Sequence, residues 1–193
     1  MSSSGNASET GPLRLGIAGL GTVGGGVVRM VQQHGDLLAT RCSRPMQITA
    51  ISARDKSRDR GLDLGAFTWH DDPVDLARSD EIDVLVELIG GNEGPAKLAV
   101  EAAIANGKDV VTANKALVAH HGTALAQTAE ARGVALNYEA AVAGGIPIVK
   151  AMREGLAGNS FSRVYGILNG TCNYILSAMR DSGRDFLDVL DEA

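Results

Sequence analysis

A glycine-rich stretch near the start of the chain, LRLGIAGLGTVGGGVV from Leu13 to Val28, restricts the possible folds most strongly. An apolar run with alternating leucine and isoleucine leads into the pattern Gly19-x-Gly21-x-x-Gly24. Valines at helical spacing follow the last of these glycines. A strand, a glycine turn and a helix in this order are typical of a dinucleotide-binding α/β unit.

Each glycine of the pattern has its own physical reason. Gly19 lets the chain turn sharply off the strand, and Gly24 lets the helix pack closely against it. Gly21 has no Cβ, so a pyrophosphate can approach the backbone, where the N–H groups of the helix N-terminus favour an anion. The alternative is a purely structural glycine turn, and the strand and helix on either side favour the nucleotide.

Length and composition limit the classes of function. The chain has 193 residues, enough for one domain and part of another, and its net charge of −5 does not indicate a nucleic-acid partner. No apolar run reaches the roughly 20 residues that span a membrane. The two cysteines are far apart and have neither metal nor redox spacing, which favours the cytoplasm. We expect a disordered leader over residues 1–12.

A second strand is predicted over Met46–Ser52, and in this kind of fold its tip faces the adenosine ribose. No acidic residue precedes Asp55 there, whereas Arg54 offers a planar, charged partner for a 2′-phosphate. The pattern therefore favours NADP over NAD. In the alternative interpretation, Arg54 is a solvated charge in the run RDKSRDR.

The segment Asp83–Ile89, DVLVELI, is almost continuously apolar, which is typical of a parallel strand buried on both faces. Loops at the carboxyl ends of such strands form the ligand crevice, so Gly90 and Gly91 are candidates for close contact with a cofactor. They are equally compatible with a plain turn. Further elements are predicted as helices at 73–79, 95–106 and 116–132, the last interrupted at His120–Gly122, and as strands at 108–112 and 134–138.

Two later residues follow predicted strands and carry possible chemistry. Lys115 comes after the strand 108–112, where it can reach a substrate or the nicotinamide ribose, or remain a solvated surface charge. Glu139 opens the nearly uncharged loop EAAVAGGIPIV and can help bind a cation or cap the amides of that loop. The adjacent His120 and His121 cannot face one ion as an i, i+4 pair would, so we interpret them as capping or surface residues.

The last fifty residues do not complete a core of their own. We expect a helix over Ile146–Leu156, a strand over Phe161–Leu168 and a helix over Thr171–Met179, with a further helix beginning at Asp185. A single strand with a few helices cannot bury all of its apolar faces. The sequence therefore predicts one complete domain over residues 13–145 and the beginning of another over 146–193.

Four stretches together resemble one family, the homoserine dehydrogenases. They are GLGTVGGGVV (19–28), KDVVTANKALVA (108–119), NYEAAVAGGIPIV (137–149) and GILNGTCNYIL (166–176). The resemblance implies a Rossmann-type, doubly wound parallel sheet of the α/β class, followed by the incomplete start of an α+β domain for substrate binding and dimerisation. It also implies NAD(P)-dependent interconversion of L-aspartate 4-semialdehyde and L-homoserine, on the route to threonine, methionine and isoleucine.

The resemblance implies roles for individual residues. Lys115 would reach the active site, both as a catalytic residue and beside the cofactor. The remaining cofactor-binding residues would be Gly19, Gly21, Thr22, Val23, Gly24, Arg54 and Gly90. Asn169, Gly170 and Thr171 would contact the substrate. Glu139 and the carbonyls of Val142, Gly144 and Ile146 would hold a sodium or potassium ion, which prefers such oxygen ligands.

The resemblance covers the N-terminal portion of the family, which carries a downstream Asp/Lys pair for substrate binding and proton transfer. We therefore expect this chain to bind cofactor with little turnover alone, and the full-length protein to form a homodimer. An alternative is a regulatory module that binds NAD(P) without catalysis. Aspartate-semialdehyde dehydrogenase is disfavoured, because that enzyme needs a cysteine with a histidine partner and no histidine follows Cys172.

Overall fold

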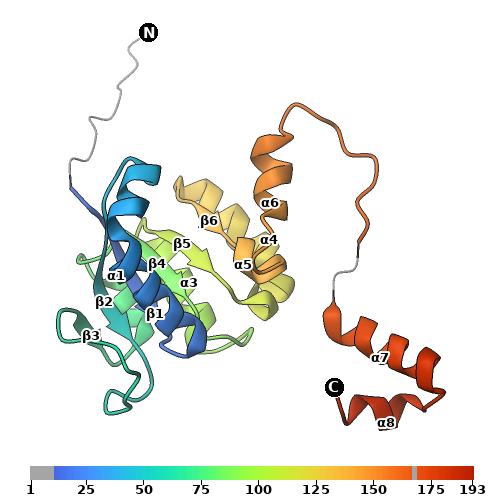
Figure 1. Ribbon diagram of the computed structural model, residues 1–193. Helices are drawn as coiled ribbons and strands as arrows, with labels where there is room; N and C mark the ends of the chain where they lie inside the picture. Colours follow the sequence, from blue (N-terminus) through green and yellow to red (C-terminus); the bar gives the residue numbers. More distant parts are fainter. Residues whose placement is uncertain (1–10, 167–168) are drawn as a thin grey trace. The chain divides into compact units, whose positions relative to one another are not determined.

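The computed structural model describes residues 11–166 and 169–193, in two compact units (Figure 1). The first unit extends to Pro147 and the second runs from Ile148 to Ala193. Each unit is described by itself.

A single parallel sheet forms the centre of the first unit. Its strands lie in the order β3-β2-β1-β4-β5-β6, and every neighbouring pair is parallel, which confirms the predicted α/β class. The first strand of the chain, β1, lies inside the sheet between β2 and β4. The strands are β1 (Leu13–Ala18), β2 (Met46–Ser52), β3 (Thr68–His70), β4 (Val84–Glu87), β5 (Asp109–Thr112) and β6 (Leu136–Asn137).

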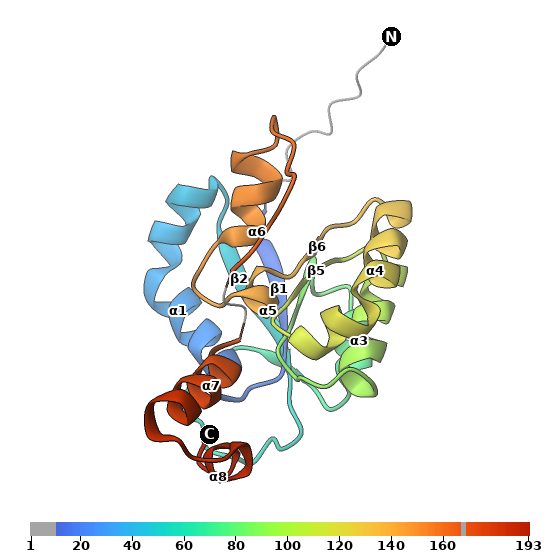
Figure 2. The same ribbon diagram turned by 90° about the vertical axis from the view of Figure 1, so that its right-hand side faces the viewer.

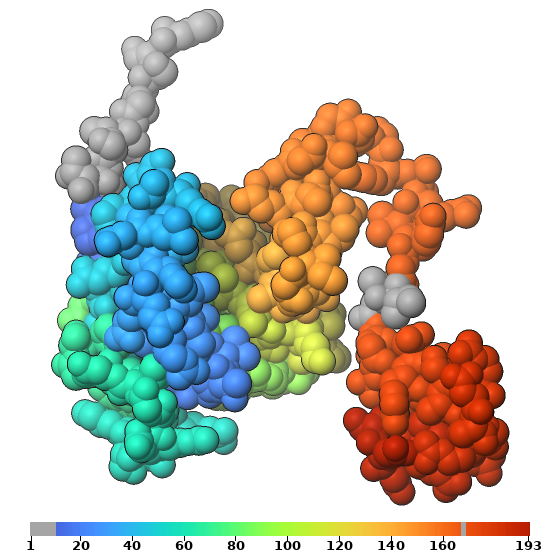
Figure 3. All heavy atoms as spheres, in the orientation of Figure 1, coloured from blue at the N-terminus to red at the C-terminus, as the bar shows by residue number. Residues whose placement is uncertain are grey.

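Helices cover both faces of this sheet (Figure 2). The helix α1 (Thr22–Cys42) packs on one face through Val28 and Val31, together with apolar side chains of the excursion 55–67, which lies beside α1 in Figure 3. The opposite face carries α2 (Pro73–Arg78), α3 (Pro95–Ala105) and α4 (Lys115–Arg132). A short helix, α5 (Glu139–Val142), follows β6. Among the described residues, no helix combines the length and apolarity needed to cross a bilayer.

The apolar pattern predicted most of these elements, and β4 shows why. All four of its residues are buried, as expected for a strand covered on both faces. One expectation was wrong, and one element was missed. Residues 120–122 do not interrupt α4, because an isolated glycine is tolerated within a helix. The strand β3 was not predicted, since it has only three residues and follows a polar excursion.

The described residues of the second unit are helical or irregular. They include α6 (Ile148–Lys150), a π-helical turn η1 (Ala151–Gly155), α7 (Gly170–Ser182) and α8 (Phe186–Leu190). The strand expected over Phe161–Leu168 was wrong for residues 161–166, while 167 and 168 lie outside the described residues. Alternation alone does not make a strand, and no other strand is present among the described residues of this unit to pair with it.

The pair Arg14–Asp83 fastens β1 to the residue before β4. The backbone N–H of Arg14 donates to Oδ2 of Asp83 at 2.9 Å, and its Nε donates to Oδ1 at 3.1 Å. In return, the N–H of Asp83 donates to the carbonyl of Arg14 at 2.8 Å. The hydrogen bonds from the Arg14 side chain hold the pKa of Asp83 below its ordinary value.

We expect Asp83→Asn to lower the free energy of unfolding at pH 7 by about 1 kcal/mol, because the pair is partly exposed to solvent. A lowered carboxyl pKa stabilises the fold above the unfolded-state value, and this contribution disappears as the pH falls through the folded-state value. The difference between variant and wild type should therefore shrink below about pH 4. Urea unfolding followed by fluorescence of Trp69, the one tryptophan, at pH 7 and pH 3 measures this. A difference that is the same at both values would contradict it.

Candidate functional site

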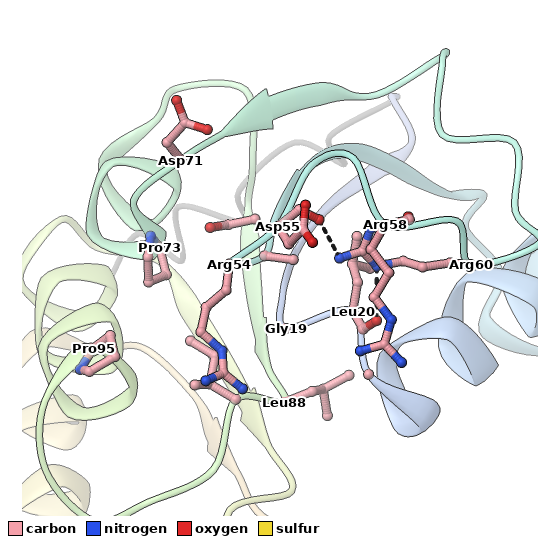
Figure 4. A pocket seen from close by; sticks show the side chains of 14 residues that line it. Gly19, Leu20, Arg54, Asp55, Arg58, Arg60, Asp71, Pro73, Leu88 and Pro95 are labelled. Atoms are coloured by element: carbon pink, nitrogen blue, oxygen red, sulfur yellow. Dashed lines mark hydrogen bonds between the residues drawn. The ribbon is translucent and has the colours of Figure 1, made fainter.

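A pocket of about 480 Å³ lies at the carboxyl ends of β1, β2 and β4 (Figure 4). Three segments form most of its wall: the glycine turn Gly19–Gly21, the loop that follows β2, and Leu88–Ile89 after β4. Crevices at this edge of a parallel sheet are where ligands bind in open α/β folds. The remaining lining residues are Asp71, Pro73 and Pro95.

The glycine turn is packed tightly at two positions and open at the third. A Cβ on Gly19 would lie 2.6 Å from the carbonyl oxygen of Leu88, and Gly19 has a φ of +102°. A Cβ on Gly24 would lie 1.9 Å from the carbonyl oxygen of Gly19. Nothing lies within 4 Å of a Cβ built on Gly21. The turn therefore leaves space beside Gly21, next to the first N–H groups of α1, which have no intrahelical partner.

The loop after β2 places charged groups along the pocket. Arg54 is exposed and lines the pocket, as does Arg58 (Figure 4). Asp55 also lines it, but its Oδ1 accepts hydrogen bonds from the backbone N–H and the hydroxyl of Ser57, at 2.8 and 2.7 Å. These bonds keep the pKa of Asp55 below its ordinary value. The carboxylate is thus engaged within its own turn.

Arg60 also lines the pocket, and no prediction from the sequence singled it out. Its guanidinium donates to three backbone carbonyls, those of Leu20 at 3.2 Å, Asp55 at 2.6 Å and Arg58 at 2.8 Å. It also lies 5.9 Å from the centre of the Trp69 ring. Arg60 therefore fastens the loop after β2 to the glycine turn, and no local pattern in a run of alternating charges distinguishes it from its neighbours.

The ends of β4 and β5 carry two further predicted residues, which are not among those lining the pocket in the described chain. Gly90 has a φ of +89°, and its N–H donates to Oε1 of Glu87 at 3.1 Å. Lys115 is exposed and is the first residue of α4, after the capping residue Asn114. Among the predicted cofactor residues, Gly19, Gly21 and Arg54 line the pocket, while Thr22, Val23 and Gly24 form the first turn of α1.

The predicted cation loop follows β6. Glu139 is the first residue of α5 and is half-buried, and Val142, Gly144 and Ile146 lie in the exposed segment after it. Val142 is the last residue of α5, and Gly144 and Ile146 follow that helix, so all four fall within one short segment of the first unit. No cluster of three or more histidine, cysteine or acidic side chains suited to a metal occurs in the described ranges, so this predicted site depends on carbonyl oxygens.

The predicted substrate residues belong to the second unit. Asn169 precedes α7, and its Oδ1 accepts a hydrogen bond from the N–H of Cys172 at 3.1 Å. Gly170 and Thr171 form the first turn of the same helix. Asn169 thus has a structural role as a helix cap, and its contact with a substrate stays a prediction.

Comparison with known proteins identifies the family. Residues 19–139, well over half of the chain, match the description "Homoserine dehydrogenase, NAD binding domain", and residues 147–193 match "Homoserine dehydrogenase". The homoserine dehydrogenase of Pseudomonas aeruginosa is 48% identical over 182 residues, which cover 94% of this chain and 41% of the relative. That of Corynebacterium glutamicum is 46% identical and covers 93% of this chain and 40% of the relative.

Solved structures agree with these matches. A homoserine dehydrogenase from Thiobacillus denitrificans has a TM-score of 0.81 and 47% identity, over 94% of this chain and 42% of that one. The Staphylococcus aureus enzyme at pH 8.5 has a TM-score of 0.76 and 37% identity, over 96% and 43%. The chain thus spans about two-fifths of the length of these relatives. Its first unit is a domain for a nicotinamide dinucleotide, and the chain belongs to the homoserine dehydrogenase family.

Proposed function

We propose that the pocket beside the glycine turn binds NADP in preference to NAD, as part of an enzyme that interconverts L-aspartate 4-semialdehyde and L-homoserine. The observation that carries the proposal is the open space at Gly21, next to the N-terminus of α1 and within a pocket lined by Arg54. The first-turn N–H groups, including those of Thr22 and Val23, suit the pyrophosphate.

The charged groups along the pocket support the preference for a 2′-phosphate. Arg54 and Arg58 line the pocket with planar, permanently charged groups that suit a phosphate. Asp55 is the first acidic residue after β2, and one of its carboxylate oxygens already accepts hydrogen bonds from Ser57. This argues against Asp55 as the acceptor of hydrogen bonds from both ribose hydroxyls of NAD. NAD remains a weaker ligand of the same pocket in this proposal.

Lys115 is proposed as the residue of this chain that reaches the reacting groups. When bound, the reduced nicotinamide supplies a hydride to the aldehyde carbon. The ammonium group of Lys115 would stabilise negative charge on the aldehyde oxygen and could donate a proton to it, although the downstream lysine of the family is the stronger candidate for that proton. In the oxidative direction, the same nitrogen would take up the proton of the homoserine hydroxyl only in its neutral amine form.

The other proposed roles follow the family. Glu139 and the carbonyls of Val142, Gly144 and Ile146 would hold a sodium or potassium ion, since hard cations prefer oxygen ligands. The segment Asn169–Thr171 would contact the small-molecule substrate, and Gly90 the cofactor. We further propose a cytoplasmic location and a homodimer of the full-length protein. The two cysteines, both free and exposed, are compatible with a reducing compartment.

Arg54→Ala should weaken NADP binding by about 10- to 100-fold, the range for losing a hydrogen bond to a charged group. Binding of NAD should change little, because NAD lacks the 2′-phosphate. Isothermal titration with the two dinucleotides in parallel measures the difference. Arg78→Ala, an exposed arginine at the end of α2 and outside the pocket, is the control. Equal losses for both dinucleotides would remove the 2′-phosphate assignment, and binding of neither by the wild type would remove the proposed function.

A further inference from the structure

A fully buried carboxylate stands at the carboxyl end of β4. The side chain of Glu87 has no exposed surface, although it interrupts an otherwise apolar run. Its Oε1 accepts hydrogen bonds from the N–H groups of Ile89 at 2.8 Å and Gly90 at 3.1 Å. Its Oε2 accepts one from the hydroxyl of Thr112, at the end of the neighbouring strand β5, at 2.5 Å. These three hydrogen bonds offset the free-energy cost of burying the carboxylate, which would be large without partners.

The donors and acceptors of this network are consistent with one another. The Oγ1 of Thr112 accepts from the N–H of Asn114 at 3.0 Å, so its single proton is directed to Glu87. The side chain of Asn114 both accepts and donates a hydrogen bond. Its Oδ1 accepts from the N–H of Leu117 at 3.1 Å, capping α4, and its Nδ2 donates to the carbonyl of Gly91 at 2.6 Å. Thr112 and Asn114 are themselves buried.

The network joins two parts of the candidate site. On one side it holds the loop after β4, which includes the pocket residue Ile89 and runs to Gly91. On the other side it holds the turn from β5 into α4, which presents Lys115 as the first helical residue. The position of Lys115 relative to the pocket wall therefore depends on the chain of bonds Glu87–Thr112–Asn114–Gly91. Fully satisfied polar networks of this kind are rigid.

We infer that Glu87, Thr112 and Asn114 are positioning residues that fix the Lys115 turn against the loop 88–91, and thereby shape the part of the site that receives the nicotinamide half of the cofactor. The inference rests on the proposed function, in which Arg54 receives the adenosine half. It predicts that substitutions in the network weaken binding of the whole dinucleotide. Binding of a fragment that contains only the adenosine 2′-phosphate end should not change.

The test uses substitutions that separate positioning from folding. Thr112→Val keeps the size of the side chain and removes the hydroxyl, whereas Thr112→Ser keeps the hydroxyl. Asn114→Ser keeps a good helix-capping oxygen and removes the amide group that donates to Gly91. The matched control is Glu93→Gln, which removes the negative charge from the exposed contact between Glu93, two residues after Gly91, and His121 in α4, at 2.7 Å. Urea unfolding by Trp69 fluorescence checks that each variant is folded.

Affinities for NADP and for adenosine 2′,5′-bisphosphate are then measured by isothermal titration. Thr112→Val and Asn114→Ser should weaken NADP binding by about tenfold, the cost of one buried hydrogen bond. The affinity for the bisphosphate should stay within about twofold of the wild-type affinity. Thr112→Ser should restore wild-type binding, and Glu93→Gln should change it little, since exposed pairs contribute little.

Three results would overturn the inference. The first is wild-type NADP affinity in both Thr112→Val and Asn114→Ser. The second is an equal loss of both ligands, which indicates a general loss of structure. The third is a defect in Glu93→Gln as large as that in Thr112→Val. Failure of the wild type to bind either ligand would overturn the proposed function itself, and this inference with it, and is thus distinguishable from the other three.

Discussion

Gly24→Ala should destabilise the first unit by about 1–3 kcal/mol, the usual cost of adding a methyl group to a packed site. The new Cβ would lie 1.9 Å from the carbonyl oxygen of Gly19, so the turn or the start of α1 must move. Because the same turn forms part of the wall of the pocket, most of the affinity for NADP should be lost as well. Urea unfolding and isothermal titration measure the two effects separately.

Gly21→Ala is the matched control for this substitution. No atom lies within 4 Å of a Cβ at this position, and its backbone has a negative φ of −77°. Its stability should therefore stay within about 0.5 kcal/mol of the wild type. NADP affinity should still fall, because the methyl group enters the space proposed for the pyrophosphate. A stable Gly24→Ala, or an unchanged affinity in Gly21→Ala, would contradict this account of the turn.

A second large effect is expected in the core. Leu85 lies in β4, has no exposed surface, and packs in the apolar cluster that joins the sheet to α3 and α4. Leu85→Ala should lower the free energy of unfolding by about 2–5 kcal/mol, because a cavity remains after the side chain is removed. The midpoint of urea unfolding, followed through Trp69, reports the loss.

Leu98→Ala is the control for the core substitution. Leu98 is also a leucine of the first unit, but it lies in α3 with 54% of its surface exposed. Its replacement should change stability by no more than about 0.5 kcal/mol. Similar losses in the two variants would show that the burial pattern described for this unit is wrong.

Much of the first unit could be predicted because its signals are local. The continuous apolar run at β4 and the Asp72-Pro73 start of α2 each depend on a few neighbouring residues. The strand predicted over 161–168 is absent at residues 161–166, because its alternation says nothing about a pairing partner. Local signals therefore predict an element reliably only where the surrounding sheet or core is also present.

The candidate site was predictable only in part, for a related reason. Gly19, Gly21 and Arg54 stand within or beside a recognisable motif, and all three line the pocket. Arg60 lies in a run of alternating charges, and its role depends on the distant carbonyl of Leu20. Glu87 did leave a signal, a charge inside an apolar strand, but its side-chain partner Thr112 lies on β5. Contacts between strand ends depend on which strands are neighbours in the sheet. No fixed spacing in the sequence therefore identifies them.

The position of β1 inside the sheet has a consequence for how the protein is made. This strand leaves the ribosome before the other strands of the sheet, yet it pairs with both β2 and β4, and Leu15 pairs with Val84. The turn at Gly19 likewise rests against Leu88. Pairings between distant parts of a chain form slowly, because loop closure comes before the gain from contact. During synthesis, one edge of β1 therefore stays unpaired until β4 emerges. In that interval the edge is available for aggregation or for binding by chaperones.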